Sequence, residues 1–227
     1  MGWNDWIRTV EVEPSLYAAD FGHLAEQVET LLGAGVRIVH WDVGDGRFVP
    51  PITMGPIVLA AISELVHSLG GAIDVHLMTE DPARYFGPFR DAGADSVTFH
   101  YEAVDDVAAV VRAAREHALG VGLAVKPATD VAAPASAAIA SGVDVVLCMS
   151  VEPGYSGQEF IPETLERMRT LRATLPPEMH IQVDGGVNPH NVRACHEAGA
   201  SLLVAATAIF EHDDLAKAYR RLVEALA

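Results

Sequence analysis

Short runs of apolar, mostly β-branched residues recur along the whole chain. Within each run the apolar residues are continuous, which is typical of parallel strands that are covered on both faces. Between the runs, apolar residues return every three or four positions, and this period predicts amphipathic helices. The eight predicted strands are 10–16, 36–41, 73–77, 96–100, 121–125, 143–149, 180–183 and 202–206.

Helical patterns follow most of these strands, for example at 21–32, 57–69, 104–117, 162–175 and 215–226. Eight strand–helix units in a chain of 227 residues predict one closed (β/α)₈ barrel, a single domain over residues 1–227. A doubly wound sheet would carry a Gly-rich turn after its first strand, and residues 17–20 carry no glycine. In a barrel of this kind, functional residues lie where the strands end and the next loops begin.

The charge of the chain narrows the range of partners. There are 15 Lys and Arg against 31 Asp and Glu, which gives a formal net charge of −16. Such a field repels polyanions, so nucleic acid is not expected as a partner, and a small anion would need local backbone donors. No apolar stretch reaches the ~18 residues of a membrane span, and the N-terminal residues do not resemble a signal peptide. We therefore expect a cytoplasmic protein without a membrane partner. We also expect a homo-oligomer.

Four ligand-type residues lie at the predicted ends of strands two, three and seven. His40 and Asp42 share one side of their strand, because strand side chains alternate. His76 and Asp184 occupy the corresponding places on the other two strands. Two imidazoles and two carboxylates form a plausible site for Zn²⁺, Fe²⁺, Mn²⁺ or Co²⁺, and the nitrogen ligands argue against Mg²⁺ and Ca²⁺. His100 ends strand four, where it could either support a ligand or be an ordinary core histidine.

A second group of residues suits a phosphate. Glycines and small residues follow strands six, seven and eight, so that backbone N–H groups can point at one anion. Barrels commonly bind phosphate in the loops after strands seven and eight. The candidate residues are Gly154, Tyr155, Ser156 and Gly157 after strand six, Gly185 and Gly186 after strand seven, and Ala206 and Thr207 after strand eight.

Several longer motifs, taken together and in order, resemble the ribulose-phosphate 3-epimerase family over nearly the whole chain. They are Pro14-Ser15-Leu16, Ala19-Asp20-Phe21, His40-Trp41-Asp42, Asp45-Gly46-Arg47-Phe48-Val49-Pro50, Val75-His76-Leu77-Met78, Phe99-His100-Tyr101-Glu102, Met149-Ser150-Val151-Glu152-Pro153-Gly154 and Val183-Asp184-Gly185-Gly186.

The resemblance implies roles for individual residues. His40, Asp42, His76 and Asp184 would bind one divalent metal, most commonly zinc or iron in this family, with no organic cofactor. Asp42 and Asp184 would also exchange the substrate proton on opposite faces of a phosphorylated ketose. The implied substrate contacts are Ser15, His76, Met78, Met149 and the phosphate loops named above. The implied reaction interconverts D-ribulose 5-phosphate and D-xylulose 5-phosphate.

Some positions depart from the usual family pattern. Gly44 stands where methionine is common, Pro51 where asparagine is usual, Ser156 where a second glycine is usual, and Ala206-Thr207 where Gly-Ser is usual. We expect Gly44 to leave space in the pocket wall, which keeps allulose 6-phosphate or another ketose phosphate as an alternative substrate. A non-catalytic sugar-phosphate-binding barrel is a second alternative. A Schiff-base aldolase using Lys126 is disfavoured, because it would not need four metal-type ligands.

Overall fold

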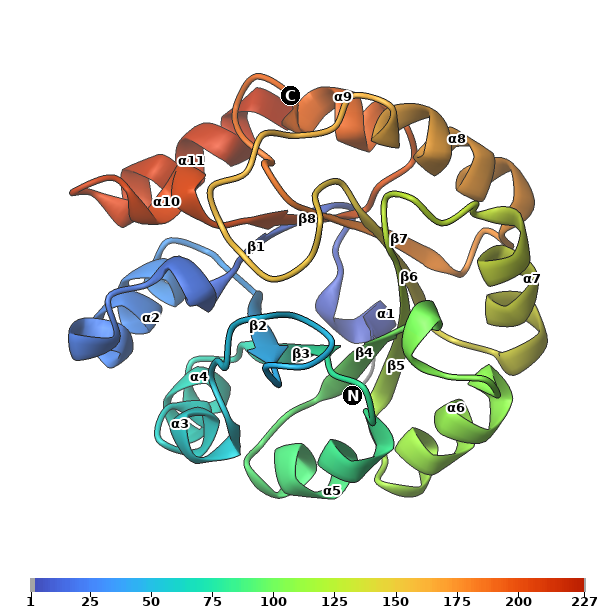
Figure 1. Cartoon of the computed structure of the whole chain (residues 1–227). Coiled ribbons are helices and arrows are strands. Elements are labelled where there is room, and N and C mark those ends of the chain that lie inside the picture. Colours follow the sequence, from blue (N-terminus) through green and yellow to red (C-terminus); the bar gives the residue numbers. More distant parts are fainter. Residues whose placement is uncertain (1–2, 227) are drawn as a thin grey trace.

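A computed structural model describes residues 3–226 of the chain, so the first two residues and the last residue of the expected domain lie outside the described part. Eight parallel strands form one sheet that curls into a barrel (Figure 1). The edge strands β1 and β2 meet through a parallel bridge between Ser15 and His40. The strands are β1 Glu11–Pro14, β2 Ile38–Gly44, β3 Ala72–Met78, β4 Ser96–His100, β5 Gly120–Val125, β6 Val145–Met149, β7 His180–Asp184 and β8 Leu202–Ala205.

Helices surround this barrel and connect its strands (Figure 1). The main helices are α2 Leu24–Gly33, α3 Pro56–Ala60, α4 Ser63–Ser68, α5 Ala83–Asp91, α6 Val107–Glu116, α7 Ala132–Ser141, α8 Thr164–Thr174, α9 Val192–Glu197 and α11 Leu215–Leu226. Shorter ones are α1 Trp3–Trp6 and α10 Thr207–Phe210, with the 3₁₀ turns η1 Leu16–Ala18, η2 Phe21–His23 and η3 Tyr101–Ala103. The predicted (β/α)₈ barrel is confirmed.

The prediction of one helix over 57–69 is wrong in one respect, because the structure has two helices there, α3 and α4. At the end of α3 the backbone N–H groups of Ala61 and Ile62 donate to carbonyls only three residues back, which tightens the coil and ends the α-helix. The apolar period continues through this turn, so the sequence pattern alone does not reveal the break.

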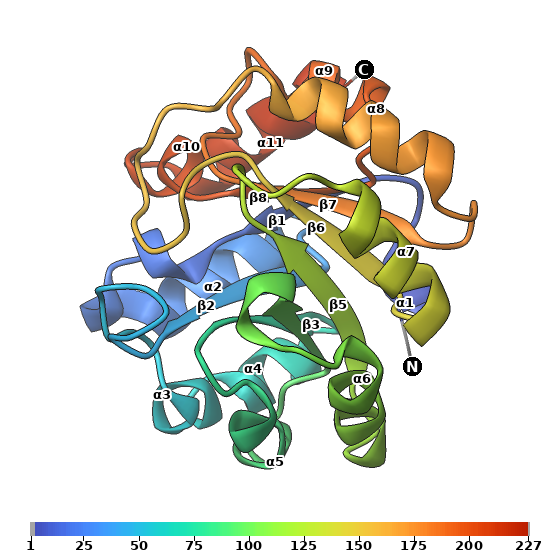
Figure 2. The same cartoon turned by 45° about the vertical axis from the view of Figure 1, so that its right-hand side comes forward.

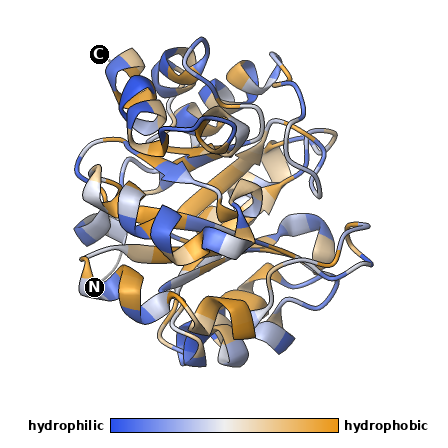
Figure 3. Cartoon of the chain, turned by 90° about the vertical axis from the view of Figure 1, so that its left-hand side faces the viewer, coloured by the Kyte–Doolittle hydropathy of each residue, from blue (hydrophilic) through white to orange (hydrophobic). Residues whose placement is uncertain are grey.

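The barrel has a closed end and an open end. The strands are buried on both faces and are mostly apolar, as Figure 3 shows, while the helices carry both apolar and polar faces. Trp3 and Trp6 of α1 form a buried cluster with the residues at which four strands begin, Ile38, Ala72, Val145 and Leu202. Figure 2 shows α1 beside this end of the barrel. Because α1 covers the start of the strands, the opposite end, where strands lead into loops, is the one available for a site.

No helix within residues 3–226 is long and apolar enough to cross a membrane.

Candidate metal centre and adjoining pocket

The four predicted metal ligands converge inside the barrel. Asp42 is paired in register with His76 on the neighbouring strand, so both side chains point inward at the same level. His76 Nδ1 lies 2.9 Å from Asp42 Oδ1 and 4.0 Å from Asp184 Oδ2. His40 Nε2 lies 3.4 Å from Asp42 Oδ1. One potential ligand atom from each of the four residues lies within 4.8 Å of the others, which is the arrangement of a metal site.

These residues lie deeper than the sequence suggested. β2 continues to Gly44 and β3 to Met78, so Asp42 and His76 are each two residues before a strand end. The expectation that the two motifs end their strands is therefore wrong. Both His40 and His76 are fully buried.

The chemistry of the donors fits a transition metal. His40 Nε2 is buried and makes no hydrogen bond within the described chain, while its Nδ1 is 3.1 Å from Asp74 Oδ2. A buried nitrogen without a partner is costly unless something else occupies its lone pair. Two imidazole nitrogens and two carboxylate oxygens suit Zn²⁺, Fe²⁺, Mn²⁺ or Co²⁺.

The two carboxylates of the cluster oppose each other electrostatically. Burial raises the pKa of Asp184, and the nearby Asp42 carboxylate raises it further. Burial also disfavours ionised Asp42, but His40 and His76 outweigh this and hold the pKa of Asp42 well below its usual range. Two buried like charges are stable together only with a compensating cation, so a divalent metal would favour ionisation of both.

Beneath the cluster lies a layer of buried polar residues to which the sequence assigned no role. Asp74 Oδ1 accepts from Ser96 Oγ at 2.7 Å, and Asp74 Oδ2 accepts from Gln182 Nε2 at 2.9 Å. Gln182 also donates to Glu13 Oε2 at 2.5 Å. Asp74 and His40 are partners in the β2–β3 register, which places the carboxylate against Nδ1. The position of Asp74, two residues before His76 on the same face, was a signal that could have found it.

His100 contacts the cluster from β4. Its Nε2 lies 2.9 Å from His76 Nε2, and its Nδ1 lies 3.3 Å from Glu102 Oε2. The burial of its ring is the main reason that the pKa of His100 falls to about 4. Of the two readings left open by the sequence, support of a metal ligand is the one that this geometry favours.

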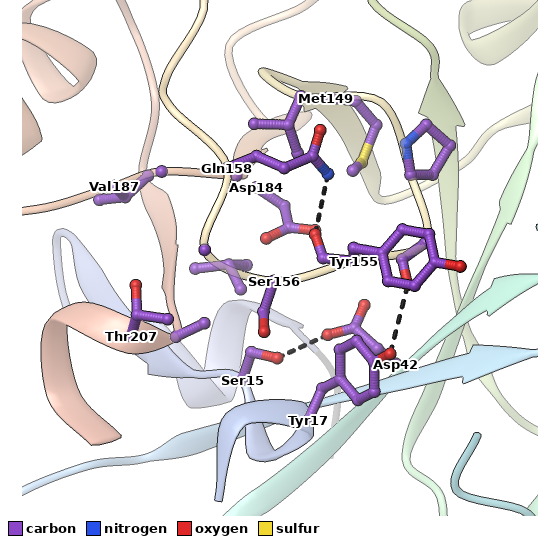
Figure 4. Close-up of a pocket in the computed structure, with 18 of the residues that line it drawn as sticks. Ser15, Tyr17, Asp42, Met149, Tyr155, Ser156, Gln158, Asp184, Val187 and Thr207 are labelled. Atoms are coloured by element: carbon purple, nitrogen blue, oxygen red, sulfur yellow. Dashed lines mark hydrogen bonds between the residues drawn. The ribbon is translucent and has the colours of Figure 1, made fainter. Parts of the chain in front are cut away.

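A pocket lined by both carboxylates opens next to the cluster (Figure 4). Every predicted substrate residue except His76 lines it. His40 and His76 are fully buried and do not line the pocket. Ser15 Oγ donates to Asp42 Oδ2 at 2.6 Å, and Tyr17 Oη donates to the Gly154 carbonyl at 3.3 Å. The lining residues to which the sequence gave no role are Tyr17, Val151, Val187 and Val204, whereas Pro153 and Gln158 belong to the expected loop after β6.

Tight backbone packing shapes the loops at one end of this pocket. A Cβ on Gly186 would lie 2.5 Å from the Phe160 nitrogen, and one on Gly185 would lie 2.4 Å from a Val151 methyl. Both glycines have positive φ, +63° and +113° respectively. Only glycine suits such positions, and it lets the loops after β6 and β7 approach each other closely.

Comparison with known proteins decides the family. The model of the ribulose-phosphate 3-epimerase family matches residues 11–210. The chain belongs to the ribulose-phosphate 3-epimerase family. It is 37% identical to the ribulose-phosphate 3-epimerase of Escherichia coli K12 over 95% of this chain and 96% of that protein. It is 40% identical to the enzyme of the same name from Schizosaccharomyces pombe, over 88% of this chain and 86% of that one.

Solved structures share the barrel at lower identity. A 3-hexulose-6-phosphate synthase superposes with a TM-score of 0.73 at 24% identity, over 96% of this chain and all (100%) of that chain. The 3-hexulose-6-phosphate synthase of Salmonella typhimurium gives a TM-score of 0.73 at 20% identity, over 95% of this chain and 98% of that one. These likenesses concern the fold alone.

One expectation about this epimerase-family chain is wrong. Gly44 does not leave space in the pocket wall, because a Cβ there would lie 2.5 Å from the Pro51 carbonyl oxygen and 3.0 Å from Val49 Cγ2. Gly44 is also absent from the pocket lining. The loop at 49–51 occupies the place that a side chain at position 44 would take. The path of this loop cannot be read from any local sequence pattern.

We therefore expect Gly44→Ala to lower the free energy of unfolding by about 1–3 kcal/mol, the usual cost of overpacking. The Pro51 carbonyl is backbone and cannot turn aside like a flexible side chain. Urea unfolding measures the change. Gly33→Ala is the matched control, because a Cβ at Gly33 meets nothing within 4 Å and its φ is not positive. Equal stability of Gly44→Ala and the wild type would show that the loop yields freely.

Lys126 does not occupy the place that an aldolase lysine would need. Its Nζ lies 3.9 Å from the centre of the Phe48 ring, and the residue does not line the pocket. This contact is a cation–π interaction. The Schiff-base reading is therefore not favoured for this member of the epimerase family.

Proposed function

We propose that the chain is a metal-dependent 3-epimerase that interconverts D-ribulose 5-phosphate and D-xylulose 5-phosphate. The observation that carries this proposal is the cluster of two histidines and two aspartates under a glycine-lined pocket. The relatives that share most of the chain are named for this reaction. The cluster includes two carboxylates that reach one point from β2 and β7.

Inverting a carbon beside a ketone requires a base on one face and an acid on the other. Asp42 and Asp184 are the proposed pair: one carboxylate oxygen removes the C3 proton, and the other carboxyl group returns a proton to the opposite face. The intermediate enediolate carries negative charge on oxygen. A divalent metal held by His40, Asp42, His76 and Asp184 would supply Lewis-acid stabilisation of that charge.

Ser15 is proposed to orient the Asp42 carboxylate as well as to contact substrate. Its hydroxyl donates to Asp42 Oδ2, which leaves Oδ1 on the side of the histidines. A fixed carboxylate needs no reorganisation when the proton moves. Met78 and Met149 are proposed as the apolar walls beside the reacting carbon, where a thioether cannot compete for the proton.

The phosphate is proposed to bind at the far end of the same pocket. Residues 154–157, 185–186 and 206–207 line the pocket, where their backbone N–H groups and the hydroxyl groups of Ser156 and Thr207 would bind the phosphate. Thr207 begins the short helix α10 directly after β8, the position at which barrels often bind phosphate. Among residues 3–226, no lysine or arginine lines the pocket, so these neutral donors would carry the binding.

Two alternatives are less well supported. A non-catalytic barrel would gain nothing from two opposed buried carboxylates, since they cost free energy without a cation. A six-carbon ketose phosphate was expected to use space at Gly44, and Pro51 fills that space. The predicted cytoplasmic location and homo-oligomeric state stay predictions.

A substrate panel tests the proposal. We expect efficient turnover of ribulose 5-phosphate, slower turnover of allulose 6-phosphate, and a loss of both kcat and affinity with unphosphorylated ribulose. The free sugar lacks the remote anion whose binding positions the reacting carbon. Steady-state rates of all three compounds give the result. Equal efficiency on free ribulose would contradict the phosphate assignment, and a preference for allulose 6-phosphate would contradict the pentose assignment.

A further inference from the structure

A line of three side chains leads from the metal centre to the rim of the barrel. His76 Nε2 lies 2.9 Å from His100 Nε2, and His100 Nδ1 lies 3.3 Å from Glu102 Oε2. His76 and His100 are fully buried, and the Glu102 side chain is only 20% exposed. A contact between two Nε2 atoms needs one hydrogen between them, so one ring must donate and the other accept.

The surroundings of Glu102 decide which ring donates. Glu102 Oε1 accepts from the Lys126 N–H at 2.8 Å and from Thr129 Oγ1 at 2.6 Å. These two donors hold the carboxylate so that Oε2 faces His100. An ionised carboxylate only accepts hydrogen bonds, so His100 carries its hydrogen on Nδ1 and offers a lone pair at Nε2. His76 must then carry its own hydrogen on Nε2.

This arrangement leaves His76 Nδ1 without a hydrogen, and Nδ1 is the atom that faces Asp42 and Asp184. We propose that Glu102 and His100 are positioning residues that fix the tautomer of His76 and present its Nδ1 lone pair to the metal. The inference rests on the metal centre of the proposed function and extends it beyond the four ligands.

His40, the other histidine of the cluster, is also oriented by a carboxylate. Asp74 Oδ2 lies against His40 Nδ1 at 3.1 Å, which leaves Nε2 directed at the cluster. The two histidines thus turn opposite nitrogens to the same point, each supported by a carboxylate. Asp74 acts directly on His40, whereas Glu102 acts on His76 through His100. Carboxylates behind metal-bound histidines commonly fix ring orientation and basicity.

Aromatic packing covers the buried histidine end of this line. The Phe48 ring packs on His100 with the ring centres 4.8 Å apart, and Lys126 Nζ lies over the same Phe48 ring. Lys126 therefore makes two contacts that support these residues: its backbone N–H donates to Glu102, and its ammonium group lies over the Phe48 ring. With water excluded, no solvent molecule can replace the hydrogen that His100 requires from His76.

Glu102→Gln is the sharpest test, because it preserves shape and reverses the pattern. The glutamine oxygen would still accept from Lys126 and Thr129, so its NH₂ group would face His100 Nδ1. His100 would then carry hydrogen on Nε2 and force His76 to carry it on Nδ1, which blocks the metal-facing atom. We expect Co²⁺ affinity, measured by chelator competition, to fall by about 10–100-fold with a changed visible spectrum of bound Co²⁺.

Thr129→Val is the matched control. It removes a donor from the same carboxylate and leaves the bond between Glu102 and His100. We expect it to lose less Co²⁺ affinity than Glu102→Gln, because the Lys126 N–H still holds the carboxylate. The melting temperature of both variants in chelator monitors the fold. Equal losses in both variants, or wild-type affinity and spectrum in Glu102→Gln, would overturn the inference. A wild-type protein that binds no Co²⁺ would instead overturn the metal centre of the proposed function.

If Glu102→Gln does not fold, two variants of His100 test the same inference. His100→Gln can donate its NH₂ to Glu102 and turn its carbonyl oxygen to His76 Nε2–H, which preserves the required pattern. His100→Leu removes the acceptor altogether. We expect His100→Gln to retain Co²⁺ affinity about 10-fold or more above that of His100→Leu. The same affinity in both would show that only bulk is needed at this position.

Discussion

Asp42→Asn and Asp184→Asn should each lower the turnover of ribulose 5-phosphate by at least about 100-fold, the usual cost of a lost general acid–base group. Each amide keeps the shape of the carboxylate but cannot take up or return the C3 proton. The assay is run with saturating metal, and bound metal is measured, because both residues also belong to the metal cluster.

Solvent deuterium separates loss of proton transfer from loss of metal. In the wild type, product formed in deuterated water should carry deuterium at the inverted carbon. In each variant the remaining aspartate should still exchange the proton of one epimer, and the two variants should favour opposite epimers. Asp105→Asn, at an exposed position, is the matched control and should react as the wild type does. Normal turnover by either cluster variant would require a different base.

Removal of the metal should reduce epimerisation by about 1,000-fold or more. Stabilisation of developing charge by a bound cation is worth several kcal/mol, and roughly 4 kcal/mol corresponds to that factor. Readdition of Zn²⁺, Fe²⁺, Mn²⁺ or Co²⁺ should restore activity to different extents. Metal analysis before and after dialysis against chelator, with rates at each stage, gives the measurement.

His76→Ala should reduce metal content and turnover together, because a site of four ligands loses its geometry when one is removed. His212→Ala is the control, since this histidine is exposed and lies away from the cluster. Full activity in a protein shown to contain no metal after exhaustive chelation would contradict the proposed mechanism.

The closeness of Asp42 and Asp184 explains why substitution of either carboxylate, or removal of the metal, should lower turnover strongly. The charge of Asp42 is one cause of the raised pKa of Asp184, after burial. A cation between the two would relieve this repulsion and make both groups available for proton exchange. The same contact that costs free energy would therefore contribute to the affinity of the site for a metal.

The sequence by itself determined the barrel and the set of four cluster residues. Both follow from local periods: continuous apolar runs separated by helical ones predict the barrel, and the alternation of side chains on a strand puts His40 and Asp42 on one face. Long motifs added the family, and the family model and relatives confirm it. The loops that line the pocket also follow from their place after successive strands.

Only the tertiary structure decided how these residues are supported and enclosed. The contacts of Asp74 with His40 and of Asp42 with His76 depend on the register of β2 against β3, which no pattern within one strand fixes. The link from Glu102 through His100 depends in addition on a loop held by Lys126 and Thr129. The space beside Gly44 was misjudged for the same reason, because the returning loop at Pro51 fills it. Local periods fix which way a side chain points, whereas the atom that it meets depends on how distant segments pack together.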